Sequence, residues 1–394
     1  MNSHVKTFLF YPIYFFISLC IILETVLRIF SSNQDGSIVL LNKRWLILPP
    51  IKTPEIIAVD SIKNCYACYD EELGWKIRQN SDSPPLYFTN SQGFRITESR
   101  YKKDFKYDGI DILTIGGSQT EGIDVKCENS WPYLIEKLSG YNVGNFGTRG
   151  YGIDQAILSY KNTNFNPRMV ILGIIPDSFE RSTRIVSMGL YGRGNISKPM
   201  FDFTDSDNYD IINIPAINGA KLEREYFYGL ESDLFKHEKA YHPYLFQSHR
   251  LDIFYSFRFF KMIPLQLENA HKKRIYISES GEFDYIKNII KVFQSIAIQN
   301  KDIPIILLMG PIPNGYNDGH TPWKKTINFI DSLKIDYVDL THELYDEVTT
   351  FPDSIYFING GHYTPKANNI IANSLLSSKG FQELGPTKKY NEGK

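Results

Sequence analysis

The chain has 394 residues and a formal net charge of −1, so its overall charge does not point to nucleic acid or to an anionic surface as a partner. That length suits one large domain or two of ordinary size. Aromatic residues make up 14% of the chain, with 26 Tyr and 26 Phe, which indicates packed domains rather than a disordered chain.

The four cysteines are too few for a disulfide scaffold. Cys65 and Cys68 form one CxxC pair, and no second pair completes a zinc site. A local disulfide and two free thiols both remain open for this pair. We therefore expect no metal, and no motif implies an organic cofactor.

The first candidate element is a helix near the N-terminus. Residues 7–23 carry no charge and would span about 25 Å as a helix, slightly less than a bilayer core. Arg28 can extend its charge toward the membrane surface, and Glu24 can pair with it. No cleavage site of small residues follows, so we predict a retained single-pass membrane anchor over residues 1–35. Basic residues flank both ends and leave its orientation open; a main domain outside the cytoplasm is the expected placement. A buried core helix is the alternative.

Residues 36–107 read as an extended lead-in that packs on the main domain, with the two short segments LGWKIRQN and TNSQGFR. From residue 108 to 384, apolar runs alternate with helical patterns, which predicts a three-layer α/β/α sandwich around a mostly parallel five-stranded sheet. The expected strands are 112–115, Asn142–Phe146, Arg168–Ile175, Ile303–Met309 and Asp336–Leu340, and the expected helices include Trp131–Leu138, Gly152–Asn162 and Thr364–Leu376.

The alternation stops within an insertion at about residues 185–285. There we expect a β-hairpin over Asn195–Pro215 and an aromatic helix over Ser248–Met262. This insertion is either a lid over the carboxyl edge of the sheet or a structural cap. The polar residues 385–394 are expected to form a flexible tail.

The first strand runs directly into Gly116, Gly117 and Ser118. The two glycines allow a sharp turn, which places Ser118 at the carboxyl end of the strand, where open α/β sheets bind their ligands. A serine hydroxyl becomes a nucleophile when a base takes its proton. His362, in the glycine loop FINGGHYTPKAN before the last helix, is the candidate base.

The run NFGTRGYG at 145–152 could direct backbone N–H groups toward a developing oxyanion, or it could be a plain βα turn. Together with GGSQTEG, with GIIPDS at 173–178 and with NGGH at 359–362, it resembles the four sequence blocks of the SGNH hydrolases, or GDSL-type esterases. The resemblance implies a flavodoxin-like sheet, Ser118 as the nucleophile, Gly150 and the Ser118 amide as oxyanion donors, and His362 as the base. Gly117 replaces the usual Asp beside the serine.

Two positions depart from the family pattern. Asp177 stands where the family has an Asn that donates to the oxyanion, and an ionised carboxylate cannot donate. Asn359 stands where the family has the acid that orients the histidine. One hypothesis is that the two roles are exchanged, so that Asp177 orients His362.

The resemblance implies a membrane-anchored serine ester hydrolase that acts on an acylated, for example O-acetylated, envelope glycan or lipid. An acyltransferase would use the same residues. The altered Asp177 and Asn359 favour a different class as the alternative, a weakly active or inactive binding or assembly module of a cell-surface polysaccharide pathway.

Overall fold

The computed structural model describes residues 3–34, 37–40, 43–48, 66–186, 196–205, 208–239, 241–242, 246–247, 249–271, 281–310, 323–350 and 361–385. These residues belong to two compact units. Unit 1 comprises residues 1–58, 186–197 and 217–272, and unit 2 comprises 59–185, 198–216 and 273–394. The domain boundaries expected from the sequence stay a prediction.

Unit 2 is built on a five-stranded parallel sheet in the order β14-β13-β10-β8-β9. The strands are β8 (Ile112–Gly116), β9 (Val143–Asn145), β10 (Met169–Ile174), β13 (Ile303–Leu308) and β14 (Asp336–Asp339). The predicted α/β class and five-stranded sheet are therefore confirmed. The order is the flavodoxin-like one, whose switch point lies between β8 and β10.

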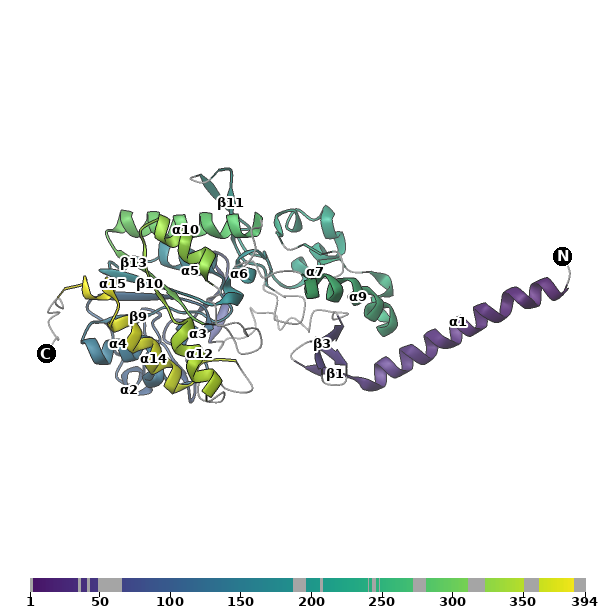
Figure 1. Ribbon diagram of the computed structural model, residues 1–394, viewed down its shortest axis with the longest axis horizontal. Coiled ribbons are helices and arrows are strands. Elements are labelled where there is room, and N and C mark those ends of the chain that lie inside the picture. The colour runs from purple at the N-terminus through teal and green to yellow at the C-terminus, as the bar shows by residue number, and fades with distance from the viewer. Residues whose placement is uncertain are drawn as a thin grey trace. The chain divides into compact units, whose positions relative to one another are not determined.

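Helices cover both faces of this sheet (Figure 1). On one face, α4 (Trp131–Ser139) packs against α14 (Pro365–Leu376), and on the other α5 (Ile153–Lys161) packs against α10 (Gly281–Asn300). Successive side chains of a strand point to opposite faces of the sheet. Because helices cover both faces, both sets of side chains are buried, as is general in parallel sheets. The apolar runs of the sequence have this origin.

Local signals in the sequence explain where the helices begin. Thr364 accepts a hydrogen bond from the Ala367 amide, and Pro365 occupies the first position of α14, as predicted. Across the two helices, the amide of Trp131 donates to Asn368 Oδ1 at 2.9 Å. Consequently the start of α4 is fixed against α14, whose N-terminus follows the candidate base.

Residues 66–107 of the lead-in contain two short hairpins and contact the edge strand β9. The hairpins pair β4 (Ala67–Asp70) with β5 (Gly74–Ile77) and β6 (Asp82–Ser83) with β7 (Tyr87–Phe88). The Arg95 amide donates to the Asn145 carbonyl of β9 at 3.0 Å. The remaining elements of unit 2 are α2 (Glu98–Tyr101), α3 (Ser118–Glu121), η2 (Cys127–Asn129), α6 (Pro176–Ser182), β11 (Met200–Phe203), β12 (Tyr209–Ile212), α11 (Lys324–Ser332), α12 (Thr341–Thr350) and α15 (Lys379–Gln382).

Unit 1 joins the N-terminal helix to part of the insertion. It contains α1 (Ser3–Phe30), β1 (Ser31–Gln34), β2 (Ser37–Leu40), β3 (Lys43–Leu48), α7 (Gly219–Tyr228), η3 (Gly229–Glu231), η4 (Phe235–His237), η5 (Arg250–Ile253) and α9 (Tyr255–His271). The predicted aromatic helix therefore begins at Tyr255 rather than at Ser248. The predicted hairpin is shorter than expected, because its strands span residues 200–212 rather than 195–215. Both strands, β11 and β12, belong to unit 2.

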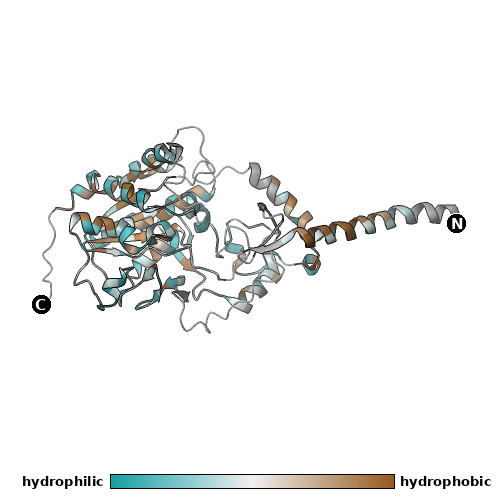
Figure 2. Ribbon diagram, turned by 90° about the horizontal axis from the view of Figure 1, so that it is seen from below, coloured by the Kyte–Doolittle hydropathy of each residue, from teal (hydrophilic) through white to brown (hydrophobic). Residues whose placement is uncertain are grey.

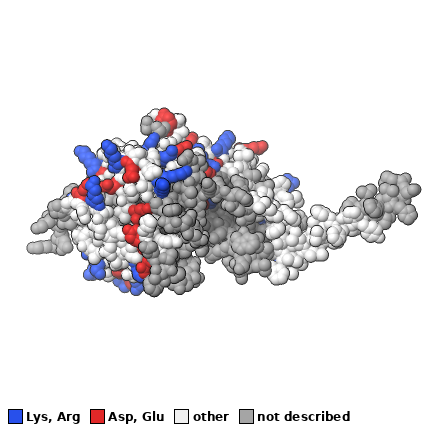
Figure 3. Space-filling model, viewed as in Figure 1, with Lys and Arg blue, Asp and Glu red and all other residues white. Residues whose placement is uncertain are grey.

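Apolar and charged residues are distributed differently over α1 and unit 2. Figure 2 shows hydrophobic colouring along much of α1. The predicted membrane span is not confirmed, because a search of the described residues finds no helix with the length and apolar character needed to cross a bilayer. On the visible face of unit 2, acidic and basic side chains are interspersed (Figure 3).

The cysteines differ in state. Cys68 is disulfide-bonded, whereas Cys20 and Cys127 are free thiols. Cys65 lies outside the described residues. Burial raises the pKa of the Cys127 thiol to about 12, so this thiol is protonated at neutral pH.

Candidate active site

Ser118 is the first residue of α3, directly after β8 and the glycine pair. Gly116 has φ +149°, and a Cβ there would lie 2.3 Å from Thr120 Oγ1 and 2.7 Å from the Gly173 carbonyl oxygen. Only glycine fits that position, because every other residue would clash with backbone of the neighbouring strand. The turn holds Ser118 at the carboxyl end of β8 with 6% of its surface exposed.

Gln119 connects the serine turn to the histidine loop. Its Nε2 donates to the Gly361 carbonyl at 3.0 Å, and its Oε1 accepts from the Tyr363 amide at 3.1 Å. These two backbone groups flank His362 on either side. The structure therefore brings the Ser118 turn and the His362 loop together, although 244 positions separate Gln119 from Tyr363.

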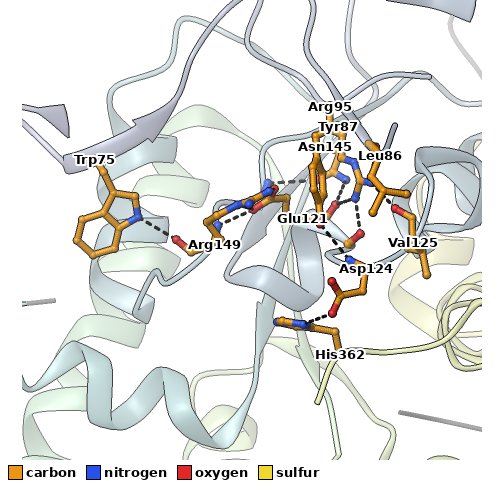
Figure 4. Close-up of polar contacts among 12 residues, drawn as sticks. Trp75, Leu86, Tyr87, Arg95, Glu121, Asp124, Val125, Asn145, Arg149 and His362 are labelled. Carbon is orange, nitrogen blue, oxygen red and sulfur yellow. Dashed lines mark hydrogen bonds and ion pairs between the residues drawn. The ribbon is translucent and has the colours of Figure 1, made fainter. Parts of the chain in front are cut away.

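His362 faces Asp124, a residue that the sequence did not single out. The Nδ1 atom of His362 lies 2.7 Å from Asp124 Oδ2, and Figure 4 shows the imidazole directed at that carboxylate. The two side chains are 22% and 39% exposed. Asp124 adopts φ +67° in the loop after α3, and its amide donates to Tyr87 Oη at 3.1 Å. Asp124 lies six residues after Ser118 and outside the four sequence blocks, so the sequence pattern could not predict it.

Arg95 fixes the loop that carries Asp124. Its guanidinium donates to the carbonyl oxygens of Gly122 at 2.5 Å, Val125 at 2.6 Å and Leu86 at 3.1 Å, and also to that of Glu121. The residue is 3% exposed. Charge-assisted hydrogen bonds to several carbonyls in succession define the path of a loop. Arg95 is the last residue of the lead-in segment TNSQGFR.

Glu121 and Arg149 connect the serine block to the glycine-rich block. The Glu121 side chain is fully buried, and its carboxylate accepts from the Arg149 amide at 2.7 Å and from Arg149 Nη2 at 2.5 Å. Burial alone would lower the pKa of Arg149, but the Glu121 carboxylate raises that pKa above its usual value. These contacts hold the 145–152 loop beside α3 (Figure 4).

Gly150, the predicted oxyanion donor, lies next in this loop. It is exposed and has φ +80°, and a Cβ there would approach the Trp75 ring to 3.2 Å. The Trp75 indole donates to the Arg149 carbonyl at 2.8 Å, so the lead-in supports the loop from behind. A cavity of about 440 Å³ opens beside the loop, and its lining includes Phe146, Thr148 and Tyr151.

The other predicted site residues are Gly117, Asp177 and Asn359. Gly117 caps α3, and its carbonyl accepts from the Thr120 and Glu121 amides. Asp177, at the start of α6, lies 3.8 Å from Arg181 Nη2, while the His362 nitrogen that it was expected to orient pairs with Asp124. Asn359 falls outside the described residues. Within the described ranges, no group of three or more His, Cys, Asp or Glu is placed to hold a metal ion.

The chain was compared with family models, curated proteins and solved structures. No family model matches the sequence, and no curated protein matches it. Among solved structures, the chain is similar to a member of the lipolytic protein G-D-S-L family from Veillonella parvula, with 12% identity over 68% of this chain and 97% of that one, and a TM-score of 0.36.

Two further solved structures are also similar to this chain. The psychrotrophic esterase EstA from Pseudoalteromonas sp. shares 9% identity over 68% of this chain and 94% of its own, with a TM-score of 0.33. LAE5, an alpha/beta hydrolase from the metagenome of Lake Arreo, shares 11% identity over 72% and 99%, with a TM-score of 0.36.

Proposed function

We propose that the chain is a serine-dependent carboxylic-ester hydrolase, with Ser118 as nucleophile, His362 as base and Asp124 as the acid that orients the imidazole. One observation carries this proposal: His362, whose Nδ1 lies 2.7 Å from Asp124 Oδ2, is on a loop that Gln119 joins to the Ser118 turn. A nucleophile, a base and an orienting carboxylate are the three parts that acyl transfer through a serine requires.

The chemistry follows from which imidazole nitrogen is occupied. Because Asp124 accepts from Nδ1–H, Nε2 is left as the basic nitrogen. Ser118 Oγ attacks the ester carbonyl and its proton passes to Nε2. The proton then goes to the leaving alcohol, and water hydrolyses the acyl-enzyme by the reverse proton path. The amides of Ser118 and Gly150 are assigned to the oxyanion by resemblance.

An acylated glycan of the cell envelope is the proposed substrate class. The cavity of about 440 Å³ beside the 145–152 loop does not include Ser118 or His362 in its lining. Its walls combine aromatic rings and side-chain amides, among them Phe146, Phe165, Gln79 and Asn164, with the charged side chains of Asp70, Glu72 and Lys76. Aromatic faces together with amide groups suit the apolar faces and the hydroxyl groups of a sugar. An acylated lipid would require a more apolar lining.

Covalent labelling tests the proposed function. Incubation of the full chain with a fluorophosphonate probe is expected to label one serine, and hydrolysis of a short-chain aryl ester is expected to stop when that serine reacts. Ser118→Ala should abolish both signals. Ser332→Ala, which removes an exposed serine of α11, is the matched control and should change neither. Unaltered hydrolysis by Ser118→Ala would overturn the assignment.

A non-catalytic binding module is the second candidate, and Asp177 favours it. This carboxylate stands in the third sequence block, where an oxyanion donor is expected. A chain that neither reacts with the probe nor hydrolyses the ester would support that candidate. An acyltransferase would react with the probe and release more alcohol when an acceptor sugar is added.

Membrane attachment with an extracytoplasmic main domain stays a prediction from the uncharged residues 7–23. Fractionation of cells that express the tagged full chain tests it. The chain should remain in the pellet after a carbonate wash, whereas a chain shortened to begin after residue 35 should be released.

A further inference from the structure

The guanidinium of Arg181 has one buried nitrogen that calls for an explanation. Its Nη1 is buried and has no hydrogen-bond partner among the described residues, and Nη2 lies 3.8 Å from Asp177 Oδ2, too far for a hydrogen bond. The side chain as a whole is 26% exposed. Burying a charged donor without an acceptor is costly, and such groups in native proteins call for a physical reason.

The guanidinium lies beside the nucleophile turn. A Cβ on Gly117 would lie 3.6 Å from Arg181 Nη1, so the residue directly before Ser118 is the neighbour of this nitrogen. The placement follows from the sheet. β8 and β10 are adjacent and parallel, with Gly116 opposite Gly173, so α3 after β8 and α6 after β10 begin at the same edge.

The burial of Arg181 lowers the pKa of its guanidinium below the usual value, and the Asp177 carboxylate opposes this effect. An arginine keeps its charge at neutral pH even so, because its usual pKa is far above 7. A positive group that is partly shielded from water interacts strongly with an anion that forms next to it.

We propose that Arg181 is a catalytic residue whose guanidinium stabilises the oxyanion formed when Ser118 attacks an ester. In this step the Ser118 Oγ–carbon bond forms, the serine proton goes to His362 Nε2, and the carbonyl π pair becomes the oxyanion beside Arg181. Collapse of the oxyanion restores the carbonyl and expels the alcohol. Asp177 then holds the guanidinium in place, which accounts for an acid where the family has an amide donor. The inference rests on the proposed hydrolase function.

Steady-state kinetics of the full chain with an aryl ester tests this role. Arg181→Gln should lower kcat by about 10²–10³-fold with little change in KM, and should slow fluorophosphonate labelling of Ser118 by a similar factor. Arg184→Gln removes an equal charge just beyond the same helix and keeps the backbone amide that donates to the Arg181 carbonyl, so it should stay within about twofold of the parent. Arg181→Lys, which keeps a positive charge, should recover part of the rate.

A double variant separates catalysis from folding. In Arg181→Gln/Asp177→Asn, an amide donor stands at 177, and kcat should rise above that of Arg181→Gln alone; a purely structural role for Arg181 would give no such rescue. An Arg181→Gln variant that folds, by circular dichroism, and keeps kcat within about threefold overturns the inference while the hydrolase stands. A rise in KM alone would make Arg181 a substrate anchor and also overturn it. If the parent chain shows no Ser118-dependent reaction, hydrolase and inference fall together.

Discussion

At the scale of single residues, one substitution tests the orienting role proposed for Asp124. Asp124→Asn keeps the shape of the side chain but removes the charge that stabilises the imidazolium and favours the Nδ1–H tautomer. We expect kcat for an aryl ester to fall by roughly 10²–10⁴-fold, since the corresponding change in a serine protease costs about 10⁴.

Asp177→Asn is the matched comparison for that change, because Asp177 is the acid that the sequence favoured. Its effect should be much smaller, because Asp177 contacts Arg181 and not the imidazole in the described part of the chain. A larger loss from Asp177→Asn than from Asp124→Asn would return the orienting role to Asp177.

The sequence could single out Ser118 and His362 as candidates because their glycine contexts are local, and their catalytic roles stay a prediction. It could not identify Asp124, whose position depends on a left-handed backbone conformation and on carbonyls gathered by Arg95 from elsewhere in the chain. It also could not identify Arg181, because its proximity to Gly117 exists only once β8 and β10 pair.

At the scale of elements, Glu24 caps a helix that is distant in sequence. Its carboxylate accepts from the Tyr255 and Ser256 amides at 3.0 and 2.8 Å and from Ser256 Oγ at 2.8 Å. Arg28 donates to the Ile253 carbonyl at 3.0 Å. Burial alone would raise the pKa of Glu24, but the hydrogen bonds lower it overall. The end of α1 is thus joined to the start of α9.

We predict that Glu24→Ala frees the first amides of α9, at a cost of about 0.5–2 kcal/mol in the stability of unit 1. Hydrogen exchange of residues 255–271 should become faster. Glu231→Ala, which removes an exposed acid in the same unit, should leave that exchange unchanged. Equal exchange in both variants would show that Glu24 does not cap α9.

Strand and helix positions could be predicted to within a residue or two at most ends, because apolar runs, Pro365 and the Thr364 cap are local signals. The start of α9 was missed by seven residues, counted from Ser248 to Tyr255. That start is set by Glu24, whose partners are more than 200 positions away, and periodicity does not register such a contact.

At the scale of the whole molecule, Asp302 makes stability depend on pH. It follows α10, accepts a hydrogen bond from Tyr160 of α5 and precedes β13. Burial raises its pKa from 3.8 to about 6, although hydrogen bonds from Tyr160 and Asn300 oppose this. The folded state therefore binds the proton more tightly, and this contribution to stability is full below pH 3.8 and lost as the pH rises through about 6.

Asp302→Asn should remove that dependence. The variant is neutral at every pH, so it should exceed the parent in stability at pH 8 by on the order of 2 kcal/mol and match it near pH 4. Urea unfolding at several pH values measures this difference. Asp210→Asn, at an exposed position of β12, should show no such crossover. A difference that is constant with pH would contradict the raised pKa.

The arrangement of the five-stranded sheet could be predicted because parallel strands and intervening helices allow few topologies. The two-unit division could not, because unit 1 gathers three separated stretches of the chain, residues 1–58, 186–197 and 217–272.

Gln119 fixes the spacing between the serine turn and the histidine loop. Because one amide side chain binds the backbone on both sides of His362, the reach from serine to imidazole is set by the two methylenes of that glutamine. The loops that precede and follow these residues can gain or lose length without altering that reach. A shorter Asn or a longer chain at 119 would change the alignment of hydroxyl and ring directly, even with every reacting group still in place.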